Sequence, residues 1–249
     1  MSAVEVTWWG HSTVSVHDCG THLLTDPLLT NRVAHLTRRR GSAPMGLAPD
    51  AVLISHLHHD HLHLPSLRLL PPGTAVLLPA GGAGLLADLD LVVTQVEPGD
   101  TVDVAGVRVR AVRAWHDGRR HPGSSWSAPA LGYVVHGSAS TWFAGDTGPD
   151  PDLGADVGAV DVALVPVGGW GPVSRSSVRG QHLGPAEAAE AVQRVGAALA
   201  VPIHYGTMWP SGMRARVSPA FAGPGAHFAA LTPQAHELTP GRSLTWPLS

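Results

Sequence analysis

The most informative stretch of this chain is Ser55-His56-Leu57-His58-His59-Asp60-His61, which has the pattern H-x-H-x-D-H. It directly follows an apolar run, residues 51–54, whose length and composition suit a strand covered on both faces of its sheet. A turn at the end of such a strand can place several imidazoles and a carboxylate around one point. Imidazole nitrogen and carboxylate oxygen are ligands that zinc, iron and manganese accept without cysteine. The stretch therefore predicts a metal site at a strand end.

Three more potential ligands follow apolar, strand-like runs. They are His116, Asp146 and His204, and each could project from the same edge of a sheet. Gly145 and Gly206 lie beside two of them and permit tight turns there. With the first stretch this gives seven candidate ligands, which suit two ions because a single zinc normally takes three or four protein ligands.

The rest of the chain predicts a layered α/β protein. Residues 4–8 and 13–17 alternate between apolar and polar types, as strands of a β-meander do. Residues 102–112 alternate as well, and 133–135, 141–144, 162–165 and 199–203 resemble buried strands. Helices are predicted at 64–70 and 185–199, the second with Pro185 at its start and an apolar face. Sheets inside and helices outside are the expected arrangement.

Composition excludes several classes of protein. The 249 residues carry a net charge of −3, and all 16 basic residues are arginines without a dense patch, which argues against binding nucleic acid. The single cysteine, Cys19, excludes an internal disulfide. No signal peptide or membrane span is recognisable, so we expect a cytoplasmic protein with one domain over residues 1–249.

Motifs in chain order resemble those of the metallo-β-lactamase-fold hydrolases, over nearly the whole length. The opening resembles the branch that contains N-acyl-phosphatidylethanolamine phospholipase D and ascorbate-6-phosphate lactonase. The matching segments, beside H-x-H-x-D-H, are Thr7-Trp8-Trp9-Gly10-His11-Ser12-Thr13, Leu24-Thr25-Asp26-Pro27, Ala114-Trp115-His116, Phe143-Ala144-Gly145-Asp146-Thr147-Gly148, Gln181-His182-Leu183-Gly184-Pro185-Ala186-Glu187-Ala188 and Pro202-Ile203-His204-Tyr205-Gly206-Thr207.

The resemblance implies a four-layer αββα sandwich, two β-sheets flanked by helices, and a dinuclear centre. It assigns His56, His58 and His116 to one ion. Asp60, His61 and His204 are assigned to the other, and Asp146 bridges both. The ions would be zinc, with manganese or iron as alternatives. The implied reaction is attack by a metal-bridging hydroxide, which Asp60 also orients.

Residues around this centre are predicted from their position in the motifs. His11 and His182 are candidates to hydrogen-bond the substrate or a ligand carboxylate, and His182 could be the acid for the leaving group. Asp26 is expected to form a turn or to accept a hydrogen bond behind a ligand. Segments 117–126 and 170–180 depart from the related phospholipase and are expected to line the substrate entrance. Their candidate substrate-binding residues are Arg119, Arg120, Trp126 and Trp170.

The function predicted first is hydrolysis of a small phosphoester or phosphodiester. A lactonase or carboxylic-ester hydrolase on the same centre is the alternative. A di-iron redox protein is disfavoured because such proteins of this fold carry Glu where His58 stands, and a non-catalytic interaction protein is disfavoured because all seven ligands are present. A β-lactamase and a tRNA nuclease are disfavoured too. The expected partner is a small-molecule substrate, and the sequence is compatible with a homo-oligomer.

Overall fold

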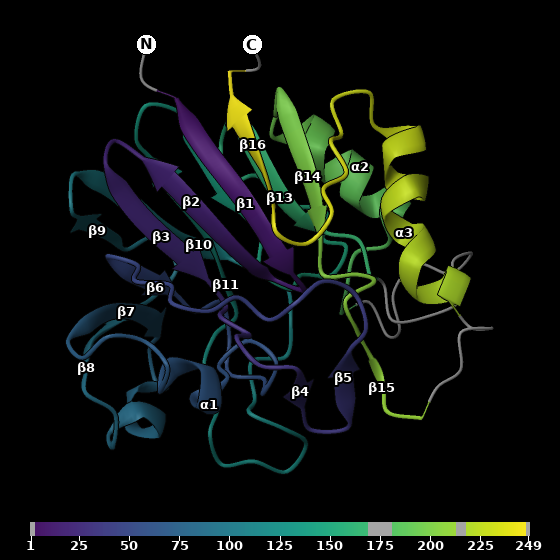
Figure 1. Cartoon of the computed structure of the whole chain (residues 1–249). Helices are drawn as coiled ribbons and strands as arrows, with labels where there is room; N and C mark the ends of the chain where they lie inside the picture. The colour runs from purple at the N-terminus through teal and green to yellow at the C-terminus, as the bar shows by residue number, and fades with distance from the viewer. Residues whose placement is uncertain (1–2, 169–180, 213–217, 248–249) are drawn as a thin grey trace.

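The first and last strands of the chain pair with each other in the larger of the two main sheets. A computed structural model describes residues 3–168, 181–212 and 218–247. Within these residues the larger sheet has seven strands (Figure 1). Their order is β16 (Arg242–Trp246), β1 (Val4–Gly10), β2 (Thr13–Asp18), β3 (Thr21–Thr25), β6 (Ala51–Leu53), β7 (Thr74–Pro79) and β8 (Leu91–Val96).

The second main sheet has six strands in the described part of the chain. Their order is β14 (Leu199–Ile203), β13 (Val162–Pro166), β12 (Ser140–Phe143), β11 (Leu131–His136), β10 (Val107–Arg113) and β9 (Thr101–Val104). A small third sheet joins β15 (Met208–Pro210), β5 (Leu36–Arg38) and β4 (Arg32–Val33).

Helices cover the outer faces of the two main sheets. The inner faces share one apolar core, which includes Trp8, Tyr133 and Trp142. On the far side of the larger sheet, α1 (Leu64–Leu67) and the 3₁₀ helix η1 (Ala83–Leu86) contribute to a second apolar cluster. The six-stranded sheet contacts α2 (Pro185–Arg194) and α3 (Ser218–Leu231), which also contact each other (Figure 1). The predicted four-layer sandwich is therefore confirmed.

Several elements differ from the sequence-based expectation, and helix α1 ends at Leu67 rather than at residue 70. Residues 102–112 form two strands, because Ala105 and Gly106 adopt positive φ angles (46° and 103°) and turn the chain between β9 and β10. The helix expected at 185–199 ends at Arg194, where Gly196 at φ 62° turns the chain toward β14. Helix α3 was not predicted, since its sequence holds Pro and Gly.

The strands bring their carboxyl ends to one region of the molecule. β6 is parallel to β3 and β7, while β12, β13 and β14 are parallel to one another. β10 runs in the same direction as β12 because each is antiparallel to β11. Candidate ligands follow β6, β10, β12 and β14 in sequence. None of the helices in the described residues is both long enough and apolar enough to span a membrane.

Candidate metal centre

The loop 55–62, here called the metal-binding loop, is fixed at its start by the strand before it. β6 is fully buried, and the N–H of Ile54 continues its ladder by donating to Leu77 O at 2.9 Å. The next N–H, that of Ser55, donates to Asp26 Oδ1 at 2.7 Å. Gly145 lets the loop after β12 approach, since a Cβ there would lie 2.8 Å from the Ser55 Cβ and its φ is 63°.

The structure gathers the candidate ligands into two adjoining groups. In each group one nitrogen or oxygen per residue lies within 4.8 Å of the others. One group is His56, His58 and His116, and the other is Asp60, His61, His204 and His11. These are the two sets that the resemblance assigned to separate ions, with His11 added to the second.

Asp146 lies between the two groups. Its Oδ2 is 3.2 Å from His61 Nε2 and 3.3 Å from His204 Nε2. Asp146 also forms a potential ligand group with His116 and His182. The side chain is 2 % exposed, so its charge is almost entirely removed from water. This is the position that a bridging carboxylate needs.

Hydrogen bonds from behind fix which nitrogen each imidazole presents to the centre. His61 Nδ1 donates to Asp26 Oδ2 at 2.7 Å, and His116 Nδ1 donates to the carbonyl of Gln181 at 2.7 Å. Ser55 Oγ donates to the same Asp26 oxygen at 2.5 Å and therefore accepts from His56 Nδ1 at 2.9 Å. In its neutral form each of these rings turns an unprotonated Nε2 inward, as a metal ligand must.

The inward-facing atoms cannot satisfy one another. His58 Nδ1 lies 2.9 Å from His56 Nε2 and 3.1 Å from His116 Nε2, yet a neutral His58 has one proton to offer. His61 Nε2 and Asp146 Oδ1 are buried without a hydrogen-bond partner in the described part of the chain. Convergent nitrogen and oxygen lone pairs around buried carboxylates fit divalent cations.

Burial and charge act in opposite directions on these groups. Burial raises the pKa of Asp146, but His204 and His61 outweigh it and the pKa lies well below its ordinary value. Asp60 shows the same balance, chiefly through His61. Burial lowers the pKa of His58 to about 4. The carboxylates are therefore ionised at neutral pH and His58 is unprotonated, which are the states that bind metal. At His61, burial is outweighed by Asp146, Asp60 and Asp26, which raise its pKa well above the ordinary value, so a metal ion would have to displace its proton.

His11 and His182 both contact the centre. His11 is 3 % exposed, and its Nε2 lies 3.0 Å from Asp60 Oδ2. His182 Nδ1 is 3.4 Å from Asp146 Oδ2, and its ring lies edge-on to His116 at 4.8 Å. Burial lowers the pKa of His182 below its ordinary value, so the neutral ring prevails at pH 7.

The four residues predicted to bind substrate differ in their placement. Arg119 is exposed and pairs with Asp117, with Nη2 and Oδ2 2.6 Å apart. Arg120 turns inward and is 6 % exposed. Trp126 is 40 % exposed, whereas Trp170 falls outside the described residues.

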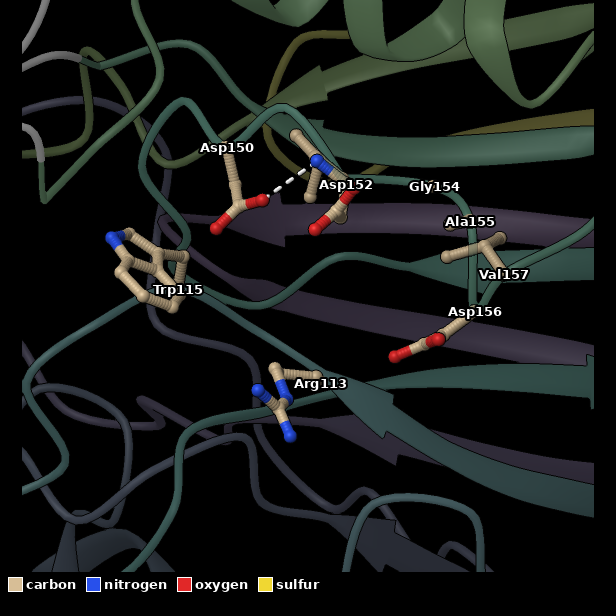
Figure 2. Close-up of a pocket in the computed structure, with 9 residues that line it drawn as sticks. Arg113, Trp115, Asp150, Asp152, Gly154, Ala155, Asp156 and Val157 are labelled. Atoms are coloured by element: carbon tan, nitrogen blue, oxygen red, sulfur yellow. Dashed lines mark hydrogen bonds between the residues drawn. The ribbon is translucent and has the colours of Figure 1, made fainter.

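Two hollows lie beside Trp115, the residue that precedes His116. One, of about 300 Å³, is lined by Arg113, Trp115 and the segment 150–157 (Figure 2). The other, of about 410 Å³, shares Arg113 and Trp115 and also includes His116 and Gln181. Trp115 is held by its backbone, since its N–H donates to Thr147 Oγ1 at 2.9 Å, while half of the side chain stays exposed.

Sequence reasoning missed Gln181, Ser55 and Trp115 as parts of the site. Gln181 accepts from His116 through its backbone and from Asp117 N through Oε1, at 2.7 Å each. Ser55 and Trp115 precede ligands in the sequence, and that adjacency was the available signal. A residue next to a ligand is bound to lie near the centre, although its side chain need not face it.

Comparison with known proteins agrees with the fold. The family described as "Beta-lactamase superfamily domain" matches residues 21–205. The chain belongs to this family. It is a metal-dependent hydrolase of the metallo-β-lactamase superfamily, as its relatives are.

Two curated relatives match most of the chain. A UPF0173 metal-dependent hydrolase of Methanopyrus kandleri is 31% identical over 227 residues, which cover 83% of this chain and 86% of the relative. An N-acyl-phosphatidylethanolamine-hydrolyzing phospholipase D of Caenorhabditis elegans is 29% identical over 240 residues, 85% of this chain and 66% of that protein.

Solved structures share the fold at lower identity. Igni18, a metallo hydrolase from Ignicoccus hospitalis, has a TM-score of 0.71 at 20% identity, covering 99% of this chain and 100% of its own. CmlA, a diiron β-hydroxylase from Streptomyces venezuelae, has a TM-score of 0.69 at 20% identity, covering 98% of this chain and 54% of its own.

Proposed function

We propose that this hydrolase holds two divalent ions, zinc in the first place, and hydrolyses a small phosphoester or phosphodiester. The observation that carries the proposal is the convergence of His56, His58 and His116 beside a second group, with the buried carboxylate of Asp146 between them. Two such ions would acidify a shared water and polarise the substrate oxygen. A cytoplasmic location and a homo-oligomeric state are further expectations.

The ligand-bearing loops are built to hold their geometry before substrate arrives. Asp26 and Gln181 fix the orientation of His61 and His116 from behind. The Asp60 carboxylate is in turn held by His11 at 3.0 Å and stays 22 % exposed. Asp60 is the residue we assign to orienting the nucleophile.

We assign His182 to interaction with the substrate, although it also forms a potential ligand group with His116 and Asp146. Its side chain is 17 % exposed and borders Asp146. Because burial lowers its pKa, the neutral ring would act through an N–H hydrogen bond to the leaving group, not as a permanently charged acid. His11 is more deeply buried, so we assign it to positioning Asp60.

The phosphoester preference is supported by the relative that hydrolyses a phospholipid. A lactonase or carboxylic-ester hydrolase would use the same ligands, and CmlA shows that this fold also supports di-iron chemistry. Water activation and oxygen polarisation by the two ions would serve a phosphoester and a carboxylic ester alike.

A metal analysis followed by a substrate panel tests the proposal. Protein purified without added metal should contain two zinc or manganese ions per chain and hydrolyse bis-p-nitrophenyl phosphate but not lactones. Asp146→Asn should lose bound metal and turnover together. Lactone hydrolysis without phosphodiesterase activity would favour the alternative, whereas iron with oxygen uptake, or full turnover by Asp146→Asn, would refute the proposal.

A further inference from the structure

The segment after His116 folds into a hairpin, residues 118–128, that lies against the metal-binding loop. Arg119 and Ser127 form a β-bridge, and the N–H of Arg120 donates to the carbonyl of Trp126 at 2.9 Å. The N–H of Ala128 donates to Gly118 O at 3.3 Å. The sequence predicts that this segment lines the substrate entrance, but the inward-facing residue of the hairpin contacts the metal-binding loop.

Arg120 is the inward-facing residue of the hairpin. Its Nη1 donates to two carbonyls, those of Leu57 and Leu62, at 2.6 Å each. Leu57 lies between the ligands His56 and His58, and Leu62 directly follows the ligand His61. A single nitrogen therefore joins both ends of the stretch that carries four candidate ligands.

Other contacts hold the hairpin over the same loop. The ring of His121 stacks on that of His59, with centroids 6.0 Å apart and planes 11° apart. The indole of Trp126 lies over Gly84 in η1, where a Cβ would collide with it. The hairpin thus touches the metal-binding loop and its neighbour at three points, and Arg120 is the buried one.

The charge of Arg120 is attracted by the nearby carboxylate of Asp60, but this attraction does not outweigh the effect of burial. Burial lowers the pKa of Arg120 to about 10, so the guanidinium stays protonated at neutral pH. A buried cation behind a centre for divalent cations repels them. What the side chain can contribute is geometry, since two buried backbone carbonyls would otherwise lack these donors.

We propose that Arg120 is a positioning residue, which holds the metal-binding loop in its ligating conformation by bracing the carbonyls of Leu57 and Leu62. The hairpin that carries Arg120 starts beside His116. It therefore also links His116 to the candidate ligands of the metal-binding loop. This inference rests on the proposed metal centre.

Two variants and one matched control test it. Arg120→Met removes both hydrogen bonds while filling similar space, and Arg120→Lys keeps the charge on a shorter side chain. Arg38→Met is the control, because Arg38 is also buried and donates to three carbonyls, Trp9 O at 2.9 Å, Leu28 O at 2.7 Å and Thr30 O at 3.5 Å, none of which belongs to the metal-binding loop.

The readouts are zinc affinity by chelator competition and the visible spectrum of the cobalt-substituted protein. Arg120→Met should weaken zinc binding about 10–100-fold and alter the cobalt bands, as loss of groups behind a ligand does, with Arg120→Lys in between. Arg38→Met should lower the melting temperature but leave both readouts unchanged. If Arg120→Met does not fold, a changed affinity or spectrum in Arg120→Lys supports the inference.

Wild-type affinity and spectrum in Arg120→Met would overturn it, as would an unchanged Arg120→Lys where Arg120→Met fails to fold. An equal loss of zinc affinity in Arg38→Met would also overturn it, because any buried arginine would then have the same effect. A wild-type protein that binds no divalent metal would instead refute the proposed metal centre, so the two failures can be told apart.

Discussion

Asp26 acts on the centre without being assigned as a ligand. Its two oxygens accept from Ser55 N, Ser55 Oγ and His61 Nδ1, and it is fully buried. Through Ser55 it also fixes the ring of His56. One carboxylate thereby sets the orientation of a ligand in each metal group.

Asp26→Asn should weaken metal binding. The amide offers one acceptor oxygen in place of two. The nitrogen that replaces the other oxygen cannot accept a hydrogen bond from the Ser55 or His61 donors that face it. We expect a loss of about 10–100-fold in zinc affinity, measured by chelator competition. Asp18→Asn is the control, since Asp18 is also buried and accepts from Ser138 N far from the centre. Equal metal affinity in wild type and Asp26→Asn would contradict this role.

The residue types of the site were predictable, and the directions of some side chains were not. The spacing of H-x-H-x-D-H and the strand ends before Asp146 and His204 indicated which residues could meet. The direction of the Arg120 side chain, toward substrate or toward a backbone carbonyl, depends on the twist of the hairpin. That hairpin has no hydrophobic periodicity from which the direction could be predicted. Gln181 acts partly through its main-chain carbonyl, which no side-chain motif reveals.

Among the elements, the buried strands were the easiest to predict, because continuous apolar runs such as 162–165 have few other uses. The ends of elements were harder. The helix predicted at 185–199 extends beyond Gly196, where the real helix has already ended. Residues 102–112 show one continuous alternating pattern, because the two residues with positive φ turn the chain without interrupting that pattern. Helix α3 packs by tertiary contacts against α2 and β14, which overrides its weak helix propensity.

Asp161 joins the starts of neighbouring strands and should make stability depend on pH. Its Oδ2 accepts from Ser140 N at 2.8 Å and from Ser140 Oγ at 2.7 Å, and these bonds lower its pKa. A lowered folded-state pKa contributes stability above the unfolded-state value, about 4, and this contribution is lost as pH falls through the folded-state value.

Denaturant unfolding of wild type and Asp161→Asn checks this. The free energy of unfolding of the wild type should exceed that of the variant at about pH 6, and the difference should shrink toward about pH 3. A difference that does not vary with pH would mean that the Asp161 carboxylate is not responsible.

At the scale of the whole molecule, the candidate centre joins both main sheets. Ligands come after β6 in the larger sheet and after β10, β12 and β14 in the other. Two sheets meeting at one edge could be anticipated from the sequence. The return of β16 to pair with β1 and the small sheet of β4, β5 and β15 could not, because such pairings join segments far apart in sequence.

Removal of metal should therefore destabilise the whole fold. A free ion at a thousandfold excess over its dissociation constant stabilises the folded state by about 4 kcal/mol. For a chain of this size that corresponds to roughly 10 °C in melting temperature. Calorimetry with and without chelator should show the drop, and zinc should restore it. Asp146→Asn should respond little to chelator, whereas a chelator-insensitive wild type would contradict the expectation.

The backbone at the site carries a cost of its own. His11, Asp26 and His204 all hold left-handed φ angles, 55°, 32° and 59°, although none is glycine. Each such residue costs on the order of 1–3 kcal/mol. Selection of this chain for thermal stability alone would therefore favour glycine or asparagine at these three positions. The most stable variants would be those that had lost the side chains of the proposed metal centre.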